Sequence, residues 1–269
     1  MFAKRVAYTL AGALIAGGLV SSAQAAWMDP TGGWQYDYEA SSNALPAAGD
    51  GWTTGGYQTG TPSGNAYTGI VTDSQTSELA WERGQEQTGS TTRKWENTTG
   101  AALVGGIDDK VTIDLRIRIA SIDQDNPTGL VTALYFQRKT SSTTKDYYLG
   151  LGPDTVQYYN GSGATTVSSS VMGTGWHNLR LLVDTAANTM DVYFDGLGVP
   201  YIASAGLNDG SAAGMLGVYQ YTNFSGKAEI AYLKITNGEL ASVVPEPASL
   251  SLLALGASSL LIRRRRSIA

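Results

Sequence analysis

A strict alternation of apolar and polar side chains between Val111 and Ile119 constrains the fold of this chain more than any other feature of the sequence. Each odd-numbered position there is Val, Ile or Leu, whereas Thr, Asp and Arg occupy the even-numbered positions. Successive side chains of a β-strand point to opposite faces of the sheet. The segment therefore predicts an antiparallel strand over residues 110–120, with one buried face and one ionic face turned to solvent.

Other segments after residue 67 show the same two-residue period and end at turn residues such as Gly, Asn and Ser. We expect strands over residues 129–139, 146–151, 155–160, 176–184, 190–195, 215–222 and 227–236. Outside the termini, no segment keeps a helical period for three turns. Residues 26–68 contain many glycines and predict a loop-rich region. Short strands at regular spacing predict an all-β sandwich, formed by one domain over residues 26–240.

Composition removes several classes of function. The 269 residues include no Cys, which excludes disulfides, thiolate metal sites and cysteine nucleophiles. His177 is the single histidine, so a site built from several histidines is excluded as well. The formal net charge of −5 argues against a nucleic-acid partner, which would require a basic surface.

The first 25 residues have the organisation of a secretory signal peptide. Two basic residues precede an apolar run over residues 6–20, and Ala23 and Ala25 occupy the small-residue positions that signal peptidase accepts. We expect a signal helix in this segment, with cleavage after Ala25. The alternative is an uncleaved anchor helix, which the short apolar run disfavours.

An apolar segment and a basic cluster occupy the other end of the chain. As a helix, residues 250–262 would span about 20 Å, which is short for a hydrocarbon core of about 30 Å. Four arginines follow, namely Arg263, Arg264, Arg265 and Arg266. The positive-inside rule places the tail over residues 263–269 in the cytoplasm. We therefore expect a transmembrane helix in the precursor, joined to the exported domain by a linker over residues 241–249.

The linker and the segments after it resemble the PEP-CTERM sorting signal, a tail also called the ice-binding protein C-terminal domain. Its signature begins with Val244, Pro245, Glu246 and Pro247 and continues with the apolar helix and the arginines. The resemblance implies an exported protein of a Gram-negative-type bacterium. Its precursor would be held transiently in the inner membrane and processed by an exosortase-type membrane protease. Its destination would be the cell surface or the extracellular matrix of a biofilm.

A second resemblance covers about the last third of the domain. Trp176 and His177 open a strand, a hairpin ends in Tyr-Phe-Asp-Gly at residues 193–196, and a late strand follows at residues 231–235. These segments are similar to the last strands of concanavalin-like, or laminin-G-like, domains. The resemblance implies a two-sheet antiparallel jelly-roll sandwich. Members of that family bind glycans, bind protein partners or hydrolyse polysaccharides.

Pairs of adjacent tyrosines are the most suggestive candidates for a ligand site. In Tyr147–Tyr148 and Tyr158–Tyr159, one ring can fill the core while its neighbour faces outward. An exposed ring offers a flat apolar face on which a sugar can stack. The expected ligand-binding residues are Tyr148, Tyr159, Trp81 and Tyr221, with Trp95 and Tyr219 as further candidates. Packing within the sandwich is the alternative for each of them.

We expect no catalytic residue and no bound metal or cofactor. Asp191 and Asp195, the nearest carboxylate pair, would lie about 13 Å apart along one strand. A glycosidase needs a separation of about 5–10 Å. The resemblance gives His177 a structural place at a strand start. Oxygen-bearing side chains at residues 121–126 form a fragment of a calcium site, for which a solvated turn is the alternative.

Together these features predict an exported, non-catalytic surface or matrix protein that contacts extracellular polysaccharide. A structural or adhesive protein that binds other proteins is the first alternative. A polysaccharide hydrolase or lyase is the second. The expected partners are an exosortase, an extracellular polysaccharide and, transiently, the inner membrane.

Overall fold

The computed structural model describes residues 27–40, 52–59, 66–73, 76–85, 92–97, 110–122, 129–139, 144–168, 171–210, 215–220, 224–238 and 240–241. Within these residues the chain forms sixteen β-strands. No helix in these ranges has the length and apolar character that a membrane span requires. The expected signal helix with Ala23 and Ala25, the sorting tail and the helix over residues 250–262 all lie outside the described residues.

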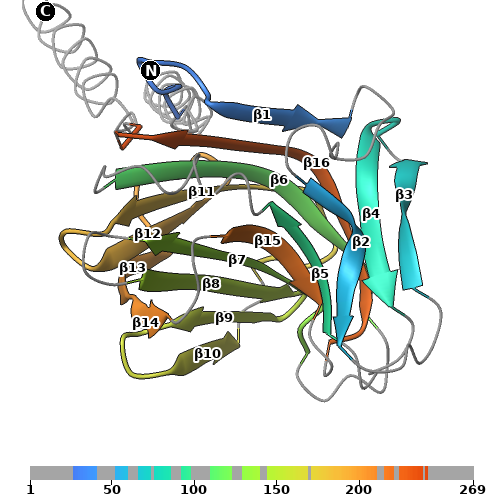
Figure 1. Ribbon diagram of the computed structural model, residues 1–269. Coiled ribbons are helices and arrows are strands. Elements are labelled where there is room, and N and C mark those ends of the chain that lie inside the picture. Colours follow the sequence, from blue (N-terminus) through green and yellow to red (C-terminus); the bar gives the residue numbers. More distant parts are fainter. Residues whose placement is uncertain are drawn as a thin grey trace, which may run out of the picture. The chain divides into compact units, whose positions relative to one another are not determined.

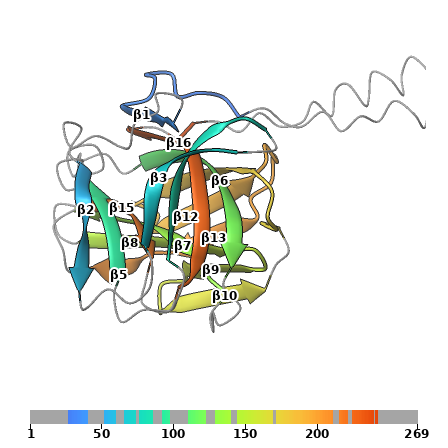
Figure 2. The same ribbon diagram turned by 90° about the vertical axis from the view of Figure 1, so that its right-hand side faces the viewer.

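The strands form two sheets (Figure 1, Figure 2). Sheet I contains, in spatial order, β13 (Ile202–Gly206), β12 (Thr189–Phe194), β11 (His177–Asp184), β6 (Lys110–Ile122), β16 (Gly226–Asn237), β4 (Leu79–Gln85) and β3 (Ala66–Thr72), with β1 (Tyr36–Glu39) also paired to β16. Sheet II contains β10 (Ala164–Ser168), β9 (Thr155–Tyr159), β8 (Thr144–Gly152), β7 (Thr132–Lys139), β15 (Met215–Gln220), β5 (Thr92–Asn97) and β2 (Trp52–Thr59), with β14 (Asn208–Gly210) also paired to β8. Neighbouring strands run antiparallel in both sheets. The predicted all-β, two-sheet antiparallel sandwich is thus confirmed.

The region over residues 26–68, predicted to be loop-rich, contains β1, β2 and the start of β3. The glycines that suggested loops have another role in β2. Its register against β5 shifts between Thr53 and Tyr57, across Gly55 and Gly56. Glycine inside a strand often marks such an irregularity, so these residues interrupt the ladder without ending the strand.

The main hydrophobic core lies between the two sheets. Sheet I contributes the apolar face of β6, from Val111 to Ile119, and sheet II contributes Tyr147, Leu149 and Leu151 of β8. Trp81 of β4 is completely buried in this core, with the ring of Tyr38 edge-on at a centroid distance of 6.2 Å. The predicted apolar face of the 110–120 strand is therefore confirmed.

The predicted ionic face of the same strand is only partly turned to solvent. Arg116 and Arg118 are half-buried, as expected for that face, whereas Asp114 is buried. A neighbouring segment closes this end of the sheet, because the Arg180 guanidinium lies over the Trp34 ring and donates to the Met28 carbonyl. Alternation within a strand cannot reveal such a cover, since the covering residues come from elsewhere in the chain.

Arg83 connects the two sheets through the core. It is almost completely buried on β4 and donates a hydrogen bond from Nη1 to the carbonyl oxygen of Val218 on β15. Its guanidinium also lies over the Trp81 ring at 5.6 Å. A buried arginine needs such partners because an unpaired buried charge is costly.

We expect the protein to lose stability at alkaline pH because of buried tyrosines. Burial raises the pKa of Tyr38 to about 12, above the value near 10 of an unfolded tyrosine. The unfolded state therefore ionises first, and Tyr38 contributes stability that is lost as the pH rises from about 10 to 12. The loss from this residue should be about 2–3 kcal/mol, measured by urea unfolding at several pH values. Tyr38→Phe should show a correspondingly smaller decline, and an unchanged decline in that variant would contradict this assignment.

Candidate functional site

Three tyrosines on neighbouring strands form a row across sheet II. Tyr135 of β7 is the cross-strand partner of Tyr148 of β8. The ring of Tyr148 stacks on that of Tyr159 of β9, with a centroid distance of 5.1 Å and an interplanar angle of 30°. Tyr219 of β15 packs edge-on against Tyr135 at 5.1 Å. We call Tyr135, Tyr148 and Tyr159 the tyrosine row.

The tyrosine row lies on the outer face of sheet II, turned away from sheet I. Tyr147 belongs to the core between the sheets and Tyr158 packs against that core. Tyr148 belongs instead to a second cluster, against which Tyr135 and Tyr159 pack. The structure thus divides each tyrosine pair between the two faces, as strand alternation predicts.

Two rings of the row are partly accessible and the third supports them. Tyr135 and Tyr159 are half-buried, whereas Tyr148 is only 5% exposed. Gly150, two residues along β8, makes room for Tyr148, since a Cβ atom there would lie 2.6 Å from the Tyr148 hydroxyl oxygen. That hydroxyl donates to Oε1 of Gln157 at 2.8 Å, so both ends of the ring are held.

Polar side chains flank the rings on the same face. Gln137 is 4% exposed, and its Nε2 atom donates to the Tyr135 hydroxyl at 2.8 Å and to Asp146 Oδ1 at 2.6 Å. Its Oε1 atom is buried without a hydrogen-bond partner among the described residues. Burial, and secondarily the charge of Asp146, raises the pKa of Tyr159, so its hydroxyl stays neutral and can donate. Flat apolar rings beside fixed amide, carboxylate and hydroxyl groups suit a ligand with apolar faces and hydroxyl edges.

Tyr135, Gln137, Asp146 and Gln157 were not among the residues predicted for the site. Tyr135 and Gln137 do stand two positions apart in an expected strand, which is the signal that they share a face. Their position beside Tyr148 and Asp146 depends on the register between β7 and β8. The sequence pattern alone does not contain that register.

The structure places the other predicted residues elsewhere. Trp81, predicted as a ligand-binding residue, is fully buried between the sheets, and its ring is therefore closed to an external ligand. The prediction failed because a tryptophan in a strand gives the same pattern whether its face is covered or open. Tyr219 is also buried, in the same outer-face cluster as Tyr148 and in contact with Tyr135. Tyr221 and the side chain of Trp95 lie outside the described residues.

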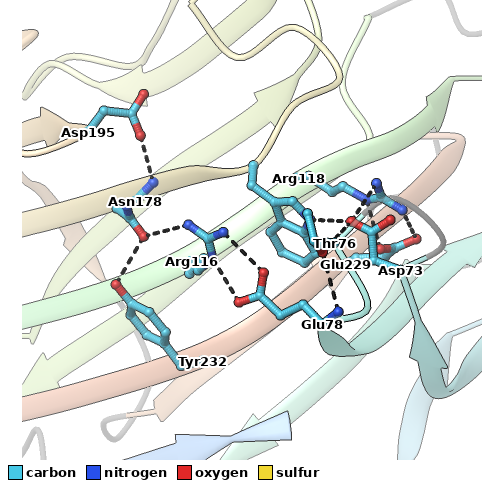
Figure 3. Close-up of polar contacts among 10 residues, drawn as sticks. Asp73, Thr76, Glu78, Arg116, Arg118, Asn178, Asp195, Glu229 and Tyr232 are labelled. Carbon is cyan, nitrogen blue, oxygen red and sulfur yellow. Dashed lines mark hydrogen bonds and ion pairs between the residues drawn. The ribbon is translucent and has the colours of Figure 1, made fainter. Parts of the chain in front are cut away.

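An ionic network occupies the outer face of sheet I (Figure 3). Arg116 donates to both carboxylate oxygens of Glu78, from Nε at 2.9 Å and from Nη2 at 3.0 Å. Arg118 binds Glu229 in the same two-pronged way and also binds Asp73 at 3.0 Å. The Trp176 ring lies 5.3 Å from each of the two guanidinium groups. These paired charges form the ionic face that the 110–120 pattern predicted.

His177 and the two aspartates considered for catalysis have structural contacts. His177 Nδ1 lies 2.7 Å from Asp195 Oδ2, and the other carboxylate oxygen of Asp195 accepts from the Asn178 backbone N–H at 2.9 Å. Asp195 has a positive φ of 50° at the turn that follows β12. Asp191 accepts a hydrogen bond from the backbone N–H of Ser204 at 2.6 Å. Each of these carboxylates therefore holds backbone in place.

The predicted calcium fragment is only partly described. Ser121 and Ile122 end β6, and residues 123–126 lie outside the described residues. Among the residues that the structure describes, no group of three or more His, Asp or Glu side chains is placed to hold a metal ion.

Comparison with known proteins identifies the tail. Residues 243–266 match the PEP-CTERM protein-sorting motif. This motif is the signal by which an exosortase recognises an exported, membrane-anchored precursor. A search of curated proteins gives no significant match.

Solved structures with a similar fold are known. The conserved carbohydrate esterase of the Shiga toxin-encoding bacteriophage phi24B is 18% identical with a TM-score of 0.50, over 77% of this chain and 99% of that one. Domain 4 of AbnA, an extracellular arabinanase of Geobacillus stearothermophilus solved with arabinotriose, is 15% identical with a TM-score of 0.46, over 77% and 94% of the two chains. The exoplasmic domain of VIP36 is 11% identical with a TM-score of 0.39, over 67% and 87%. The chain is therefore an exported protein that carries a PEP-CTERM sorting motif and has the jelly-roll β-sandwich fold.

Proposed function

We propose that the domain binds an extracellular polysaccharide through the tyrosine row, without catalysis, at the surface or in the matrix of a Gram-negative-type bacterium. The observation that carries this proposal is the alignment of Tyr135, Tyr148 and Tyr159 on three adjacent strands. Adjacent strands lie about 4.8 Å apart, so the row extends over about 10 Å. An extended row suits a linear polymer better than an isolated small molecule.

The polar groups beside the rings supply the second half of the recognition. Asp146 and Gln157 are half-buried, so parts of both side chains are accessible to a ligand beside the rings. Sugar hydroxyls both donate and accept hydrogen bonds, so they can satisfy these groups while a ring face packs on tyrosine. A protein partner could also cover such a face, and adhesion to other proteins remains the alternative function.

A non-catalytic role is supported by the use of the carboxylates. Hydrolysis of a glycosidic bond requires two carboxyl groups about 5–10 Å apart on either side of the sugar. Asp191 and Asp195 hold backbone and His177, and Asp146 accepts from Gln137. A carbohydrate esterase has a similar fold, so the experiment must also detect hydrolysis.

The test compares Tyr159→Ala with Tyr158→Ala in the full chain, kept in a detergent that contains no sugar. The two tyrosines are adjacent, but Tyr159 faces the row and Tyr158 packs against the core. Affinity electrophoresis in gels containing neutral polysaccharides should give a dissociation constant of about 10 µM to 1 mM for the original protein. Tyr159→Ala should weaken binding about tenfold, since a stacked ring contributes about 1 kcal/mol or slightly more.

Tyr158→Ala should lower stability and leave the affinity of the folded fraction unchanged. Equal losses of affinity in both variants would contradict a site on the outer face. Retention by none of the polysaccharides would favour the adhesive alternative. Release of reducing ends, or of ester-linked acids, during incubation with the polysaccharides would favour the hydrolase.

A further inference from the structure

A cavity of about 460 Å³ opens on the outer face of sheet I. It lies where β16 exchanges one neighbouring strand for another. One edge of β16 pairs with β6 throughout, and the other edge pairs first with β4, up to Ile230 opposite Trp81, and then with β1, from Tyr232 opposite Glu39. The residues that line the cavity come from these strands and from the loop before β4: Glu39, Ser77, Glu78, Leu79, Ala231 and Tyr232.

Both carboxylates that line the cavity have a cationic partner. Both oxygens of Glu78 accept from Arg116, and Glu39 accepts from Lys234 Nζ at 2.7 Å. Lys234 also lies 3.2 Å from Asp37. A cationic ligand would compete with these pairs, and an anionic ligand would meet the carboxylates. The site therefore favours a neutral ligand.

The walls combine apolar surface with hydrogen-bonding capacity. Leu79, Ala231 and the Tyr232 ring supply the apolar surface. Each carboxylate oxygen of Glu78 accepts one hydrogen bond from Arg116, and a carboxylate oxygen can accept two. Figure 3 shows Arg116 between Glu78 and Asn178, with the Tyr232 hydroxyl on the same Asn178 oxygen, 3.2 Å away. Burial raises the pKa of Tyr232 to about 12, so this hydroxyl is neutral.

We propose that this cavity is a second binding site, which takes one neutral, hydroxyl-rich unit such as a single sugar residue of a polysaccharide. Its volume is at the lower end of the range for ligand pockets, about 300–1,000 Å³. The tyrosine row lies on the outer face of the opposite sheet, so one molecule would hold two polymer chains on opposite sides. This bridging role rests on the proposed function of the row, whereas the cavity site does not.

The test counts bound oligosaccharides by equilibrium dialysis, with radiolabelled cellohexaose, xylohexaose and mannohexaose as separate probes. The full chain should bind two molecules of one probe at saturation. Ala231→Phe fills the cavity and should reduce the number to one. Ala186→Phe, at an exposed turn position after β11, is the matched control and should still bind two.

A second pair of variants covers the case in which Ala231→Phe does not fold. Glu78→Gln removes a carboxylate from the cavity, and Glu82→Gln makes the same change on β4 at a residue that does not line the cavity. Glu78→Gln should weaken one of the two binding events at least fivefold, whereas Glu82→Gln should change neither. Two sites unaffected by both Ala231→Phe and Glu78→Gln would overturn the cavity site.

Tyr159→Ala distinguishes a wrong proposal for the cavity from a wrong proposal for the tyrosine row. A single site that is lost in Tyr159→Ala and kept in Ala231→Phe would overturn the cavity as a binding site and support binding at the tyrosine row. A single site that is kept in Tyr159→Ala and lost in Ala231→Phe would support the cavity site and overturn the tyrosine row. Binding of none of the three probes would overturn the cavity site as a sugar site.

Discussion

Replacement of Arg180 by methionine should lower the free energy of unfolding by about 3–5 kcal/mol. Its side chain is 1% exposed and its Nε and Nη2 atoms each donate to one oxygen of Asp114 at 2.6 Å. A third donor, Nη1, reaches the carbonyl oxygen of Met28 at 2.7 Å. Methionine fills much of the same volume but leaves the buried carboxylate of Asp114 without its cation. That uncompensated charge is the source of the expected loss, which urea unfolding at pH 7 would measure.

Two comparisons distinguish this cause from a general loss of packing. The double variant Arg180→Met with Asp114→Leu should recover most of the stability, because no buried charge remains. Arg116→Met should cost less than about 1 kcal/mol, since the ion pair between Arg116 and Glu78 is partly exposed on both sides. If the double variant were as unstable as Arg180→Met, or Arg116→Met cost as much, the explanation would be wrong.

The pH dependence gives an independent check on Arg180→Met. Burial raises the pKa of Asp114, and the hydrogen bond and charge of Arg180 oppose that effect. Without Arg180 the folded carboxyl should bind its proton more tightly than the unfolded one. A group of this kind stabilises the fold at low pH and loses that contribution as the pH rises. The deficit of the variant should therefore shrink as the pH falls from 7 toward 4.

Replacement of Trp81 by alanine should also cost about 3–5 kcal/mol, and it should leave the polysaccharide affinity of the folded protein unchanged. Trp81 is completely buried between the sheets, beside Tyr38 and under the Arg83 guanidinium. Its removal leaves a cavity that the rigid strands around it can fill only in part. Urea unfolding measures the loss, and affinity electrophoresis at low temperature measures the binding of the folded variant.

Trp176→Ala is the matched control for this substitution. Trp176 is half-buried on the outer face of sheet I, between Arg116 and Arg118, and its indole N–H donates to Asp73 at 2.6 Å. Its loss should cost only about 1–2 kcal/mol, from the cation–π contacts and one hydrogen bond. Equal losses in the two variants would contradict the placement of Trp81 in the core. A loss of affinity confined to Trp81→Ala would restore the prediction that Trp81 binds ligand.

The sequence by itself determined the strand character of the domain and the identity of its sorting tail. The alternation from Val111 to Ile119 specified both the strand and its core face, because side-chain direction in a strand is a local property with a period of two residues. The same rule separated Tyr148 from Tyr147 and Tyr159 from Tyr158. The sorting motif at residues 243–266 is also local, since it consists of a short contiguous sequence.

Only the tertiary structure decided which faces are covered and which residues meet. Asp114 is buried because Arg180 and a segment near Met28 close over it, and Trp81 is buried because sheet II covers its face. The tyrosine row requires the register of β7 against β8, and the cavity requires β16 to exchange β4 for β1. These features depend on contacts between segments far apart in the chain. A two-residue pattern is the same whether its face is later covered, left open or aligned with another strand.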